Sequence, residues 1–336
     1  MTQIATVKKF TWIDNLRGCA CMMVVMIHTT TYYVTHGNTV GEHNWMFANM
    51  LNSASRVAVP LFMMISGYLF YGERAATKKH LLRLVGCLLF YSAVGLIYMA
   101  LLTPISAHQA LSGMLQKPAF YHLWYFYAVI VLYLLSPLIQ VKALSAGHLA
   151  VIILLAAVLA NPHSPALHLA GVKFAPINLF INGDMIYYLL YAILGRAIGM
   201  LTLDNKRVPL LSALVFLLAV ALIAAGTKKQ LIINGDFADT FYEFCGPLVF
   251  IAAVSLFIWF KSVLDHRPLA LLSWVSRHSL GIYGFHAFII HFLRTHGLDM
   301  KRWPMLDIPL IFTVTLLLSL GLAVAVEKID TRRRIS

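Results

Sequence analysis

Residues 208–226 read VPLLSALVFLLAVALIAAG and contain no charged side chain. A run of about 20 mainly apolar residues is long enough, as a helix, to cross the roughly 30 Å hydrocarbon core of a membrane. The sequence therefore predicts a transmembrane helix here. Similar stretches lie at 14–34, 53–72, 81–102, 121–140, 148–161, 183–201, 240–260, 278–297 and 307–327. We predict an all-α fold, a polytopic integral membrane helical bundle of about ten transmembrane helices, with residues 1–336 forming a single membrane-embedded domain.

The amino-acid composition excludes a soluble enzyme. Charged residues make up 12% of the chain and hydrophobic residues 60%, whereas soluble proteins contain about 25% charged residues. The net charge of +13 could indicate a nucleic-acid partner, but that partner requires a basic stripe on a polar surface. Here the cations lie between the apolar runs, so we expect contacts with membrane lipid and none with nucleic acid.

The distribution of Lys and Arg predicts the orientation of the chain. When the N-terminus is placed in the cytoplasm, most of the 26 Lys and Arg residues fall on the cytoplasmic side, as the positive-inside rule requires. An even number of spans returns the C-terminus to that side, so we expect both termini in the cytoplasm. The first span resembles a signal peptide in outline, but no small-residue cleavage site follows it, and we expect it to be retained.

Ionisable side chains inside apolar spans are the candidate functional residues, because each one needs a partner, a water-filled cavity or a task. Arg17 and His28 are eleven residues apart, which places them on nearly the same helix face with about 16 Å between them along the axis. Asp14, three residues before Arg17, can pair with it. A neutral His28 can act as a base toward a hydroxyl. The alternative is that Arg17 reaches the lipid headgroups and His28 is merely packed and hydrogen-bonded.

Three motifs, in this order, resemble those of the acyltransferase-3 family of integral membrane O-acyltransferases. The first is WIDNLRG at 12–18 followed by His28, an Arg-x10-His pattern. The second is PLFMMISGY at 60–68, which contains Ser66 and Gly67. The third is SRHSLGIYGFH at 276–286, which contains Ser276, Ser279, Tyr283 and His286. The resemblance covers essentially the whole chain.

The resemblance implies transfer of an acyl group, usually acetyl, from cytosolic acyl-coenzyme A to a hydroxyl of a cell-envelope polysaccharide or its lipid-linked precursor. The enterobacterial common antigen is the acceptor it suggests, and the bacterial inner membrane is the implied location. His28 is implied as the catalytic residue, with Arg17 as its partner near the donor. Acetyl-coenzyme A is then a donor substrate, and we expect no permanently bound cofactor.

Coenzyme A carries phosphates at one end and the thioester at the other, and its pantetheine arm is similar in length to the rise from Arg17 to His28. Phosphates held at the cytoplasmic surface would therefore leave the thioester near His28. The cations expected on that side are Arg17, Lys79, Arg83 and Arg277, and Arg in particular suits phosphate. Membrane anchoring is the alternative for each of them. His80 stands where the family usually has an arginine, which makes a donor contact at that position doubtful.

Three residues on the predicted outer side are candidates for acceptor binding. Glu243 could hold sugar hydroxyls or orient His28, and it could equally be an interfacial acid in water. Trp124 and Tyr125 could stack on a sugar ring, although aromatic residues at this depth commonly form an interfacial belt.

We expect no metal site. The four cysteines form no spaced framework for disulfides or zinc,. His286 and His291 are five residues apart, so they do not share a helix face as an i, i+4 pair of metal ligands does.

A transporter or flippase for a lipid-linked glycan is the alternative function, because buried His, Arg and Glu side chains also suit a proton-coupled carrier. Transporters often contain internal repeats. The Arg17–His28 pattern has no second copy in the other half of the chain, which favours the enzyme.

Overall fold

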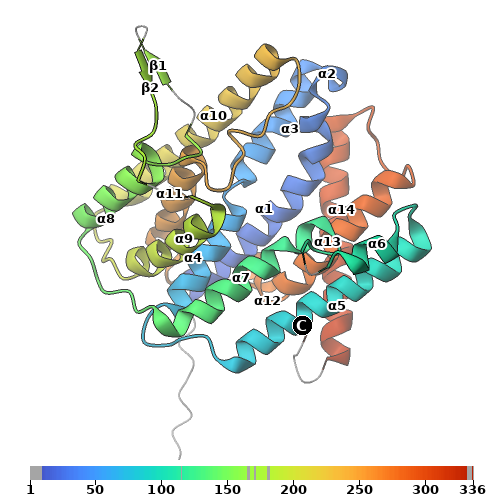
Figure 1. The fold of residues 1–336 in the computed structure, drawn as a ribbon, viewed down its shortest axis with the longest axis horizontal. Helices are drawn as coiled ribbons and strands as arrows, with labels where there is room; N and C mark the ends of the chain where they lie inside the picture. Colours follow the sequence, from blue (N-terminus) through green and yellow to red (C-terminus); the bar gives the residue numbers. More distant parts are fainter. Residues whose placement is uncertain are drawn as a thin grey trace, which may run out of the picture.

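The computed structural model describes residues 10–114, 116–164, 167–169, 172–179, 182–330 and 335 (Figure 1). The helices of the first half are α1 (Thr11–Thr35), α2 (Gly37–Val40), α3 (Glu42–Ser55), α4 (Ala58–Phe70), α5 (Lys78–Leu102), α6 (Ala107–Ser112), the short η1 (Tyr121–Leu123), α7 (Trp124–Leu135), the short η2 (Ser136–Leu138), α8 (Ala146–Ile152) and the π-helical η3 (Ile153–Leu159). The second half contains α9 (Asp184–Gly199), α10 (Val208–Asn234), α11 (Pro247–Leu264), α12 (Ala270–Arg277), α13 (Ser279–Thr295) and α14 (Pro304–Ile329).

The predicted all-α bundle is confirmed. Within the described ranges, strands occur only in one antiparallel hairpin, β1 (Leu167–Leu169) with β2 (Val172–Phe174), which projects at the upper left of Figure 1. In the described part of the chain, six helical segments are long and apolar enough to cross a membrane: Glu42–Phe70, Lys78–Leu102, Tyr121–Leu138, Val208–Asn234, Pro247–Leu264 and Pro304–Ile329. The other predicted spans are helical too, at α1, α8 with η3, α9 and α13. The number of ten spans stays a prediction.

The outward faces of the long helices are apolar. On α10 the exposed side chains include Leu210, Leu214, Leu217 and Leu218, and rows of exposed leucines also occur on α5 and α14. Apolar side chains exposed over such an area are typical of a surface that contacts another apolar phase, and here that phase is lipid. The protein is therefore located in a membrane.

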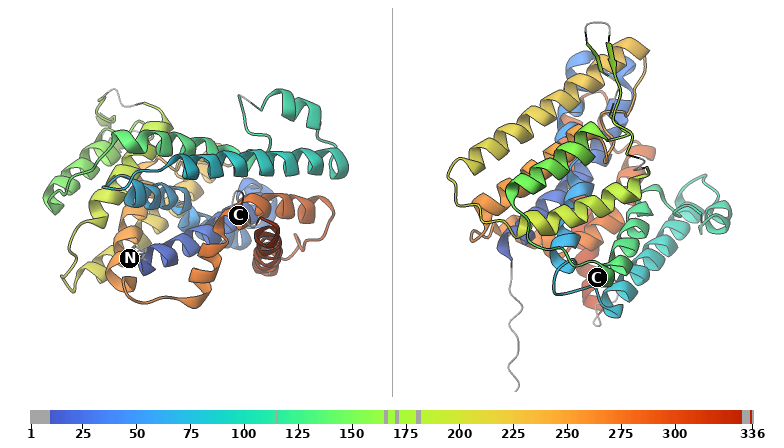
Figure 2. Two further views of the ribbon diagram at one scale, coloured as in Figure 1. Left: turned by 90° about the horizontal axis from the view of Figure 1, so that it is seen from below. Right: turned by 60° about the vertical axis from the view of Figure 1, so that its left-hand side comes forward.

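Helix α1 lies at the centre of the bundle. It contacts α3, α4, α11, α12, α13 and α14, and Figure 1 shows it running diagonally between them. Helices α5 and α7 contact each other and form a layer on one side, in teal and green in the left view of Figure 2. Because its neighbours surround it, α1 buries the polar side chains of Asn15, Thr29 and Thr30 inside the protein.

The predicted spans 14–34 and 53–72 left the residues between them unassigned, and the structure adds a helix there. Helix α3 occupies residues 42–55 and packs against α1 and α10. Its buried asparagines are paired: the Asn49 side chain donates to the Ala224 carbonyl at 2.9 Å, and the Asn52 side chain donates to Thr30 Oγ1 at 2.9 Å. Polar amide side chains resemble loop residues in a hydropathy pattern. Here each buried amide donates a hydrogen bond to a neighbouring helix.

Two predicted boundaries also differ from the structure. Helix α10 extends to Asn234, past the predicted end at 226, and α11 begins at Pro247 instead of 240. Glu243 consequently lies in the connection before α11. The terminal cations counted as cytoplasmic, Lys8, Lys9, Arg332, Arg333 and Arg334, lie outside the described residues.

Candidate active site

The motif at 12–18 forms the first two turns of α1. Some of its residues pack against neighbouring helices, and others line a cavity. Asn15 is fully buried, and its side chain donates to the Arg267 carbonyl at 2.7 Å and accepts from the Leu269 amide at 3.0 Å. A Cβ at Gly18 would lie 2.2 Å from the Leu272 carbonyl oxygen, so only glycine allows α12 to approach this closely,. These two residues fix α12 against α1.

Asp14 and Arg17 occupy another face of the same turns. The Asp14 Oδ1 atom accepts from Arg17 Nη1 at 3.5 Å and from Ser276 Oγ at 3.5 Å. The predicted pairing of Asp14 with Arg17 is thus present, and Ser276 of the third motif joins it from α12. Both charged side chains are about a quarter exposed, which leaves the guanidinium accessible to a ligand.

A cavity of about 690 Å³ opens beside this pair. Ser66, Arg83, Tyr125, Arg277, Ser279 and Tyr283 are further predicted site residues in its wall. Other lining residues come from α4, α5, α7 and α12, among them Phe62, Ile65, Tyr133 and Trp274. A smaller pocket of about 60 Å³ shares Arg83, Arg277 and Leu280 with it. The three motifs, distant in sequence, therefore meet around one cavity that is lined by three arginines.

Lys79 and His80, which are adjacent at the start of α5, lie in different surroundings. Lys79 is exposed and does not line the cavity, whereas His80 lies in the cavity wall. The His80 Nδ1 atom caps α5 by accepting from the Thr77 amide at 3.1 Å. This arrangement makes His80 a wall residue and leaves Arg83, one turn further on, as the cation of α5 that faces the cavity.

His28 lies beyond the cavity wall, in a cluster with His122 and His286. The ring centroids of His28 and His286 are 5.1 Å apart, and those of His122 and His286 are 5.2 Å apart. We call these three residues the histidine cluster. Tyr283, which lines the cavity, has its ring centroid 5.6 Å from those of both His122 and His286. One aromatic layer thus separates the cavity from the histidine cluster.

Hydrogen bonds determine the tautomers of two members of the cluster. His286 Nδ1 lies 2.7 Å from the Tyr283 carbonyl, and His122 Nε2 lies 3.1 Å from the Gly284 carbonyl. A carbonyl only accepts, so each of these nitrogens carries the proton of a neutral ring. The remaining nitrogens, His286 Nε2 and His122 Nδ1, are buried and have no hydrogen-bond partner among the described residues. They are lone-pair acceptors, and the His286 ring centroid lies 5.1 Å from that of His28.

The sequence indicated His286 as a motif residue but gave no role to His122. The buried position of His122 and its contact with the Gly284 carbonyl connect η1 to α13. Tyr283 supports the same junction, because its hydroxyl donates to the His122 carbonyl. No spacing rule could have found this contact, since it joins residues from two separate helices.

The acceptor candidates divide into two groups. Tyr125 lines the cavity. The Trp124 ring instead stacks with Phe244 at 6.0 Å and lies 5.7 Å from Tyr188. Glu243 is partly exposed beside Phe244. These aromatic rings and the acid form the outer group.

Arg56 adds a cation to the outer group. Its guanidinium lies 4.2 Å from the centroid of the Tyr242 ring and 5.5 Å from that of Phe244, distances typical of cation–π contacts. Arg56 Nε also donates to Asn52 Oδ1 at 2.9 Å. Burial raises the pKa of Glu243, as does the nearby Asp239, while His163 acts in the opposite direction. The outer group thus combines flat aromatic faces with a cation and an acid.

Ser66 and Gly67 have separate roles. Ser66 lines the cavity. A Cβ at Gly67 would lie 1.8 Å from the Ala192 carbonyl oxygen of α9, and one at Gly195 would lie 2.1 Å from the Met64 carbonyl oxygen of α4. Helices α4 and α9 therefore approach each other closely here, and this contact holds Ser66 in place.

A buried ion pair outside the cavity was not predicted. Asp307 is fully buried and contacts Arg294 at 2.6 Å, and the Tyr33 hydroxyl donates to the same carboxylate at 2.6 Å. Asp299 pairs with Arg294 from its other side at 3.2 Å. This network joins the C-terminal ends of α1 and α13 to the start of α14, and so stabilises the helices that carry His28 and His286.

A family model described as an acyltransferase domain matches residues 10–326. Neither the curated proteins nor the solved structures contain a significant match to the chain.

Proposed function

Because the chain belongs to the acyltransferase-3 family and is a membrane O-acyltransferase, we propose that it moves an acetyl group from cytosolic acetyl-coenzyme A to a hydroxyl of a cell-envelope polysaccharide or its lipid-linked precursor. The observation that carries this proposal is the 690 Å³ cavity, which has Arg17, Arg83 and Arg277 in its wall and ends one aromatic layer from His28.

The arginines match the donor. Guanidinium groups bind phosphate through paired, charge-assisted hydrogen bonds, and three of them converge on one cavity. With the phosphates held there, the pantetheine arm extends along α1, where eleven residues rise about 16 Å. This brings the thioester toward His28. Phe62, Tyr125 and Tyr283 line the cavity, and Tyr283 also packs against His122 and His286. The Tyr283 ring would have to turn aside for the arm to reach His28.

The histidine cluster matches the chemistry. His286 Nε2 is an acceptor without a partner among the described residues, and its ring centroid lies 5.1 Å from that of His28. A turn of the His28 ring would let His286 Nε2 accept its N–H and would leave the other nitrogen of His28 as the base. That nitrogen removes the proton of the acceptor hydroxyl as the oxygen attacks the thioester carbonyl. The C–S bond then breaks, and the coenzyme A thiolate takes the proton from His28. An ester and a free thiol are the products.

The outer group matches a carbohydrate acceptor. Aromatic faces such as Trp124 pack against the apolar faces of sugar rings, and Glu243 accepts hydrogen bonds from their hydroxyls. The predicted orientation places these residues on the periplasmic side of the inner membrane, with both termini in the cytoplasm. The donor and acceptor then approach His28 from opposite sides. The motif resemblance favours the enterobacterial common antigen as the polysaccharide.

Mass spectrometry of envelope glycans tests the proposal. Cells with the gene should carry O-acetyl groups on one glycan, and cells without it should lose them, as should cells that carry a His28→Ala variant expressed at the same level. Altered glycan distribution with unchanged acetylation would instead favour the glycan transporter.

A further inference from the structure

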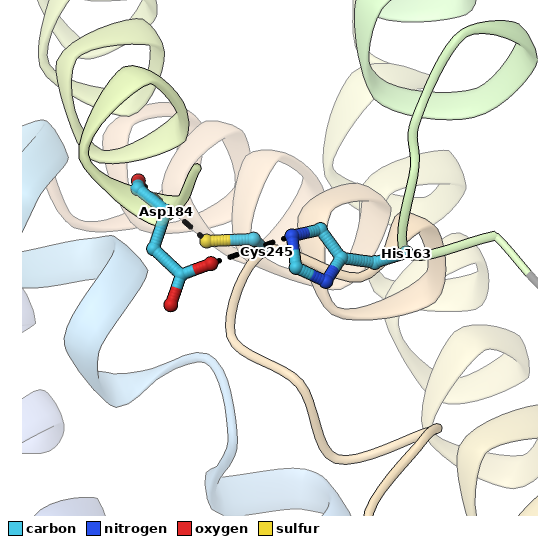
Figure 3. Close-up of side chains that lie close together, drawn as sticks. All are labelled: His163, Asp184 and Cys245. Carbon is cyan, nitrogen blue, oxygen red and sulfur yellow. Dashed lines mark hydrogen bonds and ion pairs between the residues drawn. The ribbon is translucent and has the colours of Figure 1, made fainter. Parts of the chain in front are cut away.

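Three potential metal ligands from separate segments converge beside the outer group (Figure 3). His163 follows η3, Asp184 is the first residue of α9, and Cys245 precedes α11. One donor atom from each lies within 4.8 Å of the other two. His163 Nε2 and Asp184 Oδ1 are 3.4 Å apart, close to the separation of two ligands on a tetrahedral metal ion, whose metal–ligand bonds are about 2.0–2.3 Å.

The hydrogen bonds around these three side chains leave one buried ring nitrogen without a partner. His163 Nε2 is buried and has no hydrogen-bond partner among the described residues, since its contact with Asp184 falls outside hydrogen-bond geometry. Cys245 is 1% exposed, and its thiol donates to the Asp184 backbone carbonyl at a distance of 3.8 Å. A buried ring nitrogen without a partner costs free energy, and a bound cation would remove that cost.

The ring orientation distinguishes a metal site from a catalytic triad. In a Cys–His–Asp triad, one ring nitrogen faces the thiol and the other faces the carboxylate. Figure 3 shows one nitrogen of His163 facing the Asp184 carboxylate and the other directed away from it. The donor atoms of His163, Asp184 and Cys245 all lie within 4.8 Å of one another. A single nitrogen that converges with a sulfur and an oxygen on one point is the geometry of metal ligation.

We propose that His163, Asp184 and Cys245 bind one Zn²⁺ ion. Thiolate, imidazole and carboxylate are the three ligand types that zinc prefers. The Cys245 thiol releases its proton to solvent and forms the Zn–S bond, so the thiolate and the carboxylate together neutralise the dication. A half-buried site then carries no net charge. Three protein ligands leave the fourth position for water.

The ion would hold three connections together. His163 lies after η3, Asp184 at the start of α9 and Cys245 two residues before α11, so the ligands come from three separate connections. Tyr187 packs its ring 5.8 Å from that of His163, and Tyr188, one residue on, faces Trp124 of the outer group. Zinc would therefore fix one wall of the proposed acceptor site without contacting the cavity or His28.

Zinc binding to the purified, reduced full-length protein in detergent tests this proposal. We expect one Zn²⁺ per chain to remain in competition with a chromogenic chelator that strips weaker surface sites. Cys245→Ser, His163→Gln and Asp184→Asn should each weaken this binding at least about tenfold. Asp184 is half exposed, so we expect Asp184→Asn to fold. Its zinc affinity can then be measured even if a variant of a buried ligand fails to fold. Cys19→Ser and His148→Gln, which change a cysteine and a histidine elsewhere, should bind as the wild type does.

Cobalt supplies a second readout. Co²⁺ added to the metal-free protein should give a thiolate-to-metal charge-transfer band that is absent in Cys245→Ser and present in Cys19→Ser. Zinc binding that is equal in the wild type and in all three ligand variants would overturn the proposal. A wild type that retains no zinc against the chelator, or gives no thiolate band with Co²⁺, would overturn it as well.

Discussion

Replacement of Arg17 tests whether the cavity holds the donor. The guanidinium lines the cavity, whereas Lys79, a cation on the same predicted side, is exposed outside it. A hydrogen bond to a charged group contributes about 1.5–3 kcal/mol. Arg17 shares its guanidinium with Asp14 at 3.5 Å, so we take the lower end, about 1.5 kcal/mol, which corresponds to about a tenfold change in Kd.

We therefore expect Arg17→Ala to raise the Kd for acetyl-coenzyme A about tenfold or more. Arg17→Lys should recover only part of the loss, because an ammonium lacks the planar fork of Arg. Lys79→Ala is the matched control and should bind as the wild type does. The assay is equilibrium binding of labelled acetyl-coenzyme A to protein in lipid nanodiscs at fixed salt. Equal weakening in Lys79→Ala and Arg17→Ala would show that surface charge, and not the cavity, attracts the donor.

Three further predictions concern packing, the buried ion pair and topology. Gly67→Ala forces α4 from α9 and should destabilise the fold by about 1–3 kcal/mol, seen as a lower unfolding temperature; Gly321→Ala, where a Cβ would meet nothing within 4 Å, is the control, and equal stability of the two variants would contradict the packing. Asp307→Asn removes the buried negative charge that pairs with Arg294 and should lower the free energy of unfolding by about 3–5 kcal/mol. Glu42→Gln, which breaks the exposed pair with Lys228, should leave the unfolding temperature unchanged; a similar response of both variants would refute the distinction. Reporters fused after residue 336 and within 72–80 should read cytoplasmic, and one within 163–175 periplasmic; a periplasmic C-terminus would contradict the ten-span arrangement.

The parts of the fold that were predictable from the sequence are those that repeat a local pattern. Long apolar runs predicted the helices of the bundle, because a run that is apolar along its whole length can form a helix in contact with lipid. Helix α3 was missed because Asn49 and Asn52 are polar in the pattern but buried in the structure, where each donates to a neighbouring helix. Such pairing depends on residues more than twenty positions away, which no window of sequence contains.

The candidate site shows the same division. Asp14 and Arg17 are three residues apart, so their pairing followed from helix geometry alone. The positions of His122 beside His286, and of Cys245 beside His163 and Asp184, depend on how whole helices pack. No metal site was expected, because no ligands with a close, regular spacing occur in the sequence, whereas the three ligands proposed here come from three separate connections.

The role of His28 as the base is the central claim, and His28→Gln tests it most directly. Glutamine keeps a polar side chain of similar size that can hydrogen-bond but cannot take up a proton at neutral pH. Turnover of acetyl-coenzyme A with its glycan acceptor should fall by about 10²–10⁴, while the Kd for acetyl-coenzyme A, set by the arginines of the cavity, stays at the wild-type value. A His28→Gln enzyme with wild-type turnover would show that His28 is only a packed polar residue and would contradict the account.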